Sequence, residues 1–139
     1  NTATVSGTGI TPVTAAETVN AEAAPNLAIT KSVSPVPVTE NGTLTYTFRI
    51  QNYGSVAATN TTGVVITDTF APVLNNLTAA LNGTAWTAAT DYTYNEATGT
   101  FSSTAGAITV PAATYTQDST TGAWVVTPGE STLVITGTV

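Results

Sequence analysis

The stretch that decides the fold is residues 44–52, Leu44-Thr45-Tyr46-Thr47-Phe48-Arg49-Ile50-Gln51-Asn52. Large apolar side chains alternate with polar ones along it, and successive side chains of a β-strand point to opposite faces of the sheet. The side chains expected to face a core are Leu44, Tyr46, Phe48 and Ile50. The stretch therefore predicts a strand of an antiparallel sheet with one buried and one solvated face.

Shorter alternating runs lie on both sides of this strand. They cover residues 1–5, 27–33, 64–70 and 132–139, and turn signals such as Asn82-Gly83 separate the strands. Roughly one residue in four is threonine, and β-branched residues favour strands. Together these features predict an all-β protein, an antiparallel immunoglobulin-like β-sandwich of about seven to nine strands.

The N-terminal part of the sequence is set apart from this sandwich. We expect residues 1–25 to hold a donor strand and a connector, and residues 26–139 to form the sandwich. The predicted donor strand consists of Asn1, Thr2, Ala3, Thr4 and Val5. The last strand ends without a turn, and its sequence would continue naturally into Asn-Thr-Ala-Thr-Val. We therefore expect a mature product or one unit of a longer protein, with the termini at a junction between units.

The composition disfavours several classes of function. Two basic residues against eight acidic ones give a net charge of −6, which disfavours nucleic acid and anionic membranes as partners. Because the sequence contains no Cys, Met or His, it offers no thiol nucleophile, no imidazole base and no nitrogen or sulfur metal ligand. No apolar run is long enough for direct membrane insertion. We expect no enzyme, no cofactor and no metal site.

The run of residues 27–33 contains the only lysine of the chain. Lys31 lies in the same row as Leu27, Ile29 and Val33, so we expect it to be buried on the apolar side. A buried ammonium group costs several kcal/mol unless it is paired or neutralised. Asp68 falls in the apolar row of residues 64–70, and an aspartate in that position is a natural partner for the lysine.

Three segments resemble a known repeat. They are Leu-Ala-Ile-Thr-Lys-Ser-Val-Ser-Pro at residues 27–35, the segment at residues 40–54, and Val-Val-Ile-Thr-Asp-Thr-Phe-Ala-Pro at residues 64–72. This combination is similar to the immunoglobulin-like repeat called domain of unknown function eleven, found in bacterial and archaeal surface proteins. The resemblance implies an extracellular or cell-surface location in a prokaryote, and an isopeptide bond between a first-strand lysine and a closing-strand asparagine.

Carried over to this sequence, the resemblance makes Lys31 and Asn1 the two linked residues and Asp68 the assisting acid. Asn1 shares the row of Ala3 and Val5. Lys31, Asp68 and Asn1 are therefore each expected on the apolar side of their strand. The chemistry needs a neutral amine as nucleophile and a carboxyl group that polarises the carboxamide. In the family the closing strand comes last, whereas here its motif comes first. We therefore expect the N-terminal strand to be donated to a neighbouring copy, producing a head-to-tail fibre subunit.

Several alternatives stay open at this stage. Lys31 and Asp68 can form an ordinary ion pair beside a frayed Asn1, or the leader can fold back on its own domain. The chain can instead be a stalk repeat in a tandem array, or an adhesive or carbohydrate-binding module. The aromatic residues available as sugar platforms are Trp86, Tyr92, Tyr94, Tyr115 and Trp124. A weaker alternative is a calcium site; its carboxylates would be Asp91, Asp118 and Glu130.

Overall fold

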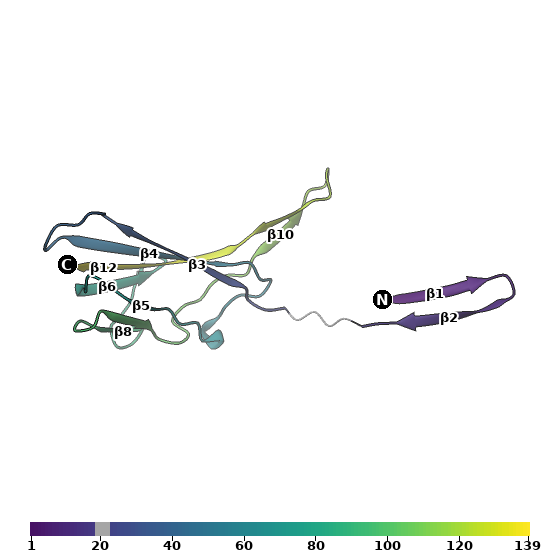
Figure 1. The fold of residues 1–139 in the computed structure, drawn as a ribbon, viewed down its shortest axis with the longest axis horizontal. Helices are drawn as coiled ribbons and strands as arrows, with labels where there is room; N and C mark the ends of the chain where they lie inside the picture. The colour runs from purple at the N-terminus through teal and green to yellow at the C-terminus, as the bar shows by residue number, and fades with distance from the viewer. Residues whose placement is uncertain (19–22) are drawn as a thin grey trace.

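The computed structural model describes residues 1–18 and 23–139, and its regular structure in these ranges is almost entirely β. The larger sheet has the strand order β3-β4-β12-β6-β7, with all neighbours antiparallel. Its strands are β3 (Leu27–Ser34), β4 (Thr43–Asn52), β12 (Gly129–Thr138), β6 (Asn75–Leu81) and β7 (Thr84–Ala85). The stretch that decided the fold is confirmed as β4, which lies between β3 and the long β12 (Figure 1).

A second antiparallel sheet has the order β5-β9-β8 and forms the other layer of the sandwich (Figure 1). Its strands are β5 (Thr67–Thr69), β9 (Thr100–Ser103) and β8 (Tyr92–Asn95). The core between the layers contains the four inward residues predicted for β4. Its most completely buried large side chains are Phe70, Leu74, Phe101, Ile108, Leu133 and Ile135. The predicted all-β, antiparallel, immunoglobulin-like sandwich is confirmed.

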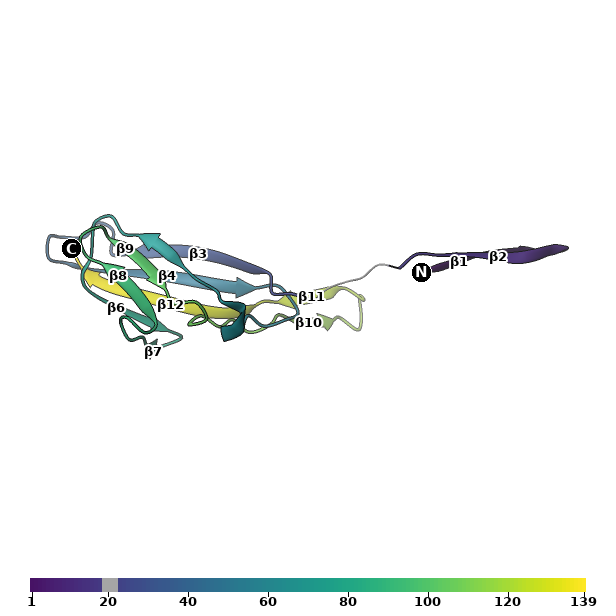
Figure 2. The ribbon, with the colours of Figure 1, turned by 90° about the horizontal axis from the view of Figure 1, so that it is seen from below.

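Two hairpins project from this body. The first consists of β1 (Thr2–Gly7) and β2 (Ile10–Ala16), and in both views it stands apart from the sandwich (Figures 1 and 2). The second consists of β10 (Thr114–Gln117) and β11 (Trp124–Thr127). A short 3₁₀ helix, η1 (Asn60–Thr62), lies in a connection.

The strand count differs from the prediction of about seven to nine, because the described residues form twelve strands. The predicted connector, residues 6–25, contains the whole of β2, because Gly9 turns the chain at a φ of 77° and lets β2 pair with β1. Residues 19–22 of that connector lie outside the described residues. The run at residues 64–70 is a strand only at Thr67–Thr69. An isolated antiparallel bridge joins Ala58 to Val110 outside the named strands.

Candidate assembly interface

Strand β3 lies at the edge of the larger sheet, and its inner face is open. Ile29 lies opposite Ile50 of β4, so the two side chains share the core-facing side of the sheet. Ile50 is only 3% exposed, whereas Ile29 is 53% exposed. The difference arises because β3 is the edge strand of its sheet and is exposed along its whole length, whereas Ile50 belongs to the core.

The facing edge belongs to β5, which pairs with β9 on one side and has an unpaired edge on the other. Two apolar hollows follow the space between β3 and β5. The first, of about 160 Å³, lies beside Leu27, Ile29 and residues 64–66. The second, of about 280 Å³, lies beside Val33, residues 35–38 and Pro72. We call this surface, from Leu27 to Val38 on one side and from Val64 to Pro72 on the other, the β3–β5 seam.

Lys31 and Asp68 meet across the seam. Asp68 lies opposite the fully buried Phe101, which puts its carboxylate on the inner face of the second sheet. The Lys31 Nζ contacts Asp68 Oδ2, and the backbone N–H of Thr69 donates to Asp68 Oδ1 at 2.9 Å. The alternation of the two strands predicts an inward position for both residues, and the structure brings them together.

The environment of Lys31 is less buried than expected. Its side chain is 41% exposed and that of Asp68 is 19% exposed, because the seam is open above them. The ammonium group also lies over aromatic rings, at 4.9 Å from the ring centre of Tyr46 and 5.4 Å from that of Phe70. Ion pairs and cation–π contacts at such exposure contribute about 1 kcal/mol each at most. The prediction of a buried lysine is therefore wrong for the single chain.

Asn1 lies away from this pair, on the β1–β2 hairpin (Figure 1). Its amino group donates to the carbonyl oxygen of Glu17 at 2.9 Å, and its carbonyl oxygen accepts from the N–H of Glu17 at 3.0 Å. It is therefore paired rather than frayed. Every residue of both hairpin strands is exposed. The sequence reasoning missed β2, although Gly7-Thr8-Gly9 between two runs of alternating small residues was a usable hairpin signal.

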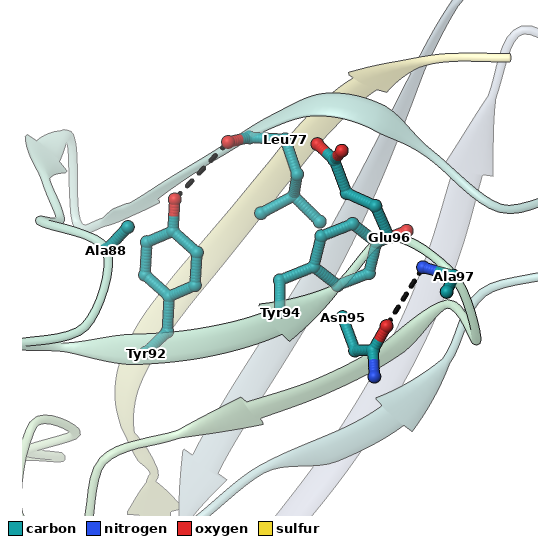
Figure 3. A pocket seen from close by; sticks show the side chains of 7 residues that line it. All are labelled: Leu77, Ala88, Tyr92, Tyr94, Asn95, Glu96 and Ala97. Carbon is teal, nitrogen blue, oxygen red and sulfur yellow. Dashed lines mark hydrogen bonds between the residues drawn. The ribbon is translucent and has the colours of Figure 1, made fainter.

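The opposite lateral edge of the sandwich carries an open hollow of about 640 Å³ (Figure 3). It is lined by Leu77, Ala88, Tyr92, Tyr94, Asn95, Glu96 and Ala97. Tyr92 is buried, and its hydroxyl donates to the carbonyl oxygen of Leu77 at 3.3 Å. Burial raises the pKa of Tyr92 above its ordinary value. The rings of Trp86 and Tyr92 stack with centres 6.5 Å apart, and the N–H of Leu74 donates to the Tyr94 hydroxyl at 2.9 Å. Three of the five aromatic residues considered for sugar binding therefore pack against the core.

The other two aromatic residues, Tyr115 and Trp124, are exposed on the β10–β11 hairpin. They share one face of it with Val126, since Tyr115 lies opposite Val126 and Trp124 lies two residues before Val126. The Tyr115 hydroxyl donates to the carbonyl oxygen of Tyr53 at 2.5 Å, which ties the base of the hairpin to the sandwich. This face is an exposed apolar surface separate from the seam.

The carboxylates considered for calcium are engaged by protein donors. Asp91 accepts from the N–H of Thr87 at 2.7 Å. The backbone N–H groups of Thr121 and Thr120 hold the pKa of Asp118 below its ordinary value. A hydrogen bond from Arg49 holds the pKa of Glu130 below its ordinary value, and Gln51 adds a second donor. In residues 1–18 and 23–139 no group of three or more acidic side chains is placed to hold a metal ion.

No known protein family, curated protein or solved structure matches the chain. The resemblance to the surface-protein repeat therefore stays a prediction. None of the helical structure in the described residues is both long and apolar enough to cross a bilayer.

Proposed function

We propose that the protein is a structural subunit of an extracellular, cell-surface fibre, in which the N-terminal segment of one copy occupies the β3–β5 seam of the next. The observation that carries this proposal is the open inner face of β3, where core-facing side chains such as Ile29 stay exposed while their partners on β4 are buried. An unpaired edge beside exposed apolar residues promotes aggregation unless a partner covers it. Head-to-tail covering that does not close on itself produces a filament.

The N-terminal segment has the properties of the missing partner. It is a strand with exposed small and apolar side chains, and it contacts its own hairpin rather than the sandwich. Donated strands add to a free edge through backbone hydrogen bonds and fill pockets with alternate side chains. The free edge of β5 and the hollows on either side of Lys31 supply both features.

Within this fibre we propose that Lys31 and the Asn1 of the neighbouring copy become linked. The Lys31 Nζ attacks the Asn1 side-chain carbonyl carbon, a new amide C–N bond forms, and the old C–N bond breaks to release ammonia. Asp68 takes the proton from the amine and returns it to the leaving group. Covering the seam removes water from Lys31, and desolvation favours the neutral amine that the attack requires.

The test compares the full chain with a variant lacking residues 1–5, by electron microscopy and by size-exclusion chromatography with light scattering. The proposal expects filaments from the full chain and single copies from the variant. Two monomeric proteins, with the variant melting at a lower temperature, would instead show that the leader closes its own sandwich. Filaments from both would show that residues 1–5 are not needed for assembly, and would contradict donation of the N-terminal strand.

A second candidate function is ligand binding at the β10–β11 hairpin. It is favoured by the exposed face that carries Tyr115 and Trp124, since aromatic rings on a projecting hairpin are available for sugar stacking. Binding of soluble oligosaccharides, followed through the fluorescence of Trp124 in a Trp86→Phe background, tests it. This activity is compatible with a fibre, because the hairpin and the seam involve different residues.

A further inference from the structure

We infer that the element exchanged between copies is the intact β1–β2 hairpin, and not the strand of residues 1–5 alone. The inference depends on the proposed function and specifies the partner of its site. It comes from the register of the hairpin, which gives both strands one common apolar face.

The register shows how this face arises. Val5 pairs with Val13 and Gly7 pairs with Ile10, so a single residue of β1, Ser6, stands opposite two residues of β2. The extra residue in β2 is a bulge, and it returns Ile10 to the face of Val13. A Cβ added at Gly7 would lie 3.2 Å from the Ile10 side chain, which agrees with this placement. The complete apolar face is Ala3, Val5, Ile10, Val13 and Ala15.

The two faces of the hairpin differ strongly in character. Thr4 lies opposite Thr14 on the other face, together with Thr2 and Ser6. The large apolar side chains Val5, Ile10 and Val13 are 56–62% exposed, so the hairpin does not cover them itself. A two-stranded hairpin without a further layer is only marginally stable in water. Both strands therefore need a common partner surface.

The β3–β5 seam fits a hairpin of this kind. β1 has six residues and β3 has eight, or about 20 Å and about 26 Å of strand. The hairpin offers a row of small and branched side chains, and the seam offers apolar hollows on both sides of Lys31. Asn1 shares the hairpin face with Ala3 and Ala15, so a docked hairpin can also present its carboxamide to Lys31.

Donation of a single strand would lose part of this fit. Removing β1 from β2 would break their backbone hydrogen bonds and leave Ile10, Val13 and Ala15 of β2 without any cover. Docking of the intact hairpin preserves those bonds and covers both strands at once. The intact hairpin therefore buries more apolar surface at a smaller cost in backbone hydrogen bonds.

A disulfide between β1 and β2 on the polar face of the hairpin distinguishes donation of the intact hairpin from donation of β1 alone. Asn1 and Glu17 exchange both backbone hydrogen bonds, so Thr4 and Thr14 form a pair without them, with Cα atoms about 4.5 Å apart, within disulfide range. The natural chain has no cysteine, so the variant Thr4→Cys/Thr14→Cys contains a single thiol pair. We expect the oxidised variant to assemble as well as its reduced form and as well as the unmodified chain. An oxidised variant that stays monomeric while the reduced one assembles would overturn the inference.

A second pair of variants decides the question if the cysteines themselves prevent assembly. Val13→Asp puts a charge on the apolar face of β2, and Thr14→Asp puts the same charge on the polar face next to it. We expect at least a tenfold loss of assembled protein for Val13→Asp and unchanged assembly for Thr14→Asp. Normal assembly of Val13→Asp would show that β2 is not part of the donated element. Absence of fibres from the unmodified chain would instead reject the proposed function.

Discussion

At the scale of single residues, the contact between Lys31 and Asp68 is the feature on which the chemistry depends. In one copy it is a partly exposed ion pair over aromatic rings, and such a pair adds little to stability. Because the pair lies in the middle of an open seam, its surroundings would change when a second copy covers the seam. A partner that covers the seam would bury both groups, and a buried charge must be paired or neutralised.

The covalent link is the first prediction at this scale. Peptide mapping of assembled protein should recover a Lys31–Asn1 pair that is lighter than the sum of its peptides by one ammonia. The matched control is Lys31→Arg, which keeps the charge beside Asp68 but offers no amine for the exchange. Its fibres should form and then dissociate in hot detergent. Free Lys31 and free Asn1 in detergent-resistant fibres would contradict the link.

A second prediction concerns Tyr92, which the sandwich buries with its hydroxyl on the Leu77 carbonyl oxygen. Because its folded-state pKa is raised above the ordinary value of 10.0, folding is favoured below that pH and loses stability as the pH rises above it. Thermal melting of the unmodified chain should therefore shift to lower temperature above about pH 10. Tyr92→Phe should reduce this alkaline shift. If the alkaline shift is the same in Tyr92→Phe, the loss of stability comes from other tyrosines and the prediction is wrong.

At the scale of elements, β3 combines the sequence of a core strand with the exposure of a surface strand. Its residues 27, 29, 31 and 33 lie on the core-facing side of the sheet, yet the whole strand is exposed, and the second sheet ends at its edge strand β5. At the other lateral edge the rings of Trp86 and Tyr92 stack, and Tyr92 is buried although an open hollow lies beside it. The two edges therefore differ in how far their core-facing side chains are buried.

This contrast predicts the behaviour of a matched pair of β3 variants. Ile29→Asp changes an inward side chain of the seam, and Thr30→Asp changes the outward side chain next to it. Because Ile29 is already half-exposed, we expect Ile29→Asp to lower the free energy of unfolding of the single copy by no more than about 1 kcal/mol, while it abolishes assembly. Thr30→Asp should leave assembly intact. Urea unfolding and sedimentation of the two variants provide the measurement.

If Ile29→Asp assembled normally, the seam would not be the binding surface. If it unfolded the single copy, β3 would instead be part of the core. Both results would contradict the interpretation of β3 given above.

The sequence predicted some of these elements because their pattern is local. The alternation of apolar and polar residues located β4. The positions of Lys31 and Asp68 within their alternating runs were enough to predict that both face inward. The exposure of β3 could not be predicted, because it depends on how many strands the other sheet has. Strand β2 was missed because its threonines and alanines carry little hydrophobic contrast, and its pairing depends on the turn at Gly9 and on the bulge.

At the scale of the whole molecule, the two features fit a single mode of assembly. A sandwich with an uncovered seam is joined to a hairpin with an uncovered apolar face, and each lacks what the other supplies. A fibre built this way needs no cysteine, which agrees with a sequence that has none. The same two features would allow one copy to close on itself, so the decisive property is whether the exchange occurs between copies.

Mixing two complementary variants tests this property most directly. Ile29→Asp disables the seam and keeps the hairpin, whereas Val5→Asp disables the hairpin and keeps the seam. Head-to-tail exchange predicts that each variant alone is a single copy, and that an equimolar mixture gives a species of twice that mass by light scattering, with no longer chains. A mixture that contains only single copies, while the unmodified chain forms filaments, would contradict exchange of the hairpin through the β3–β5 seam.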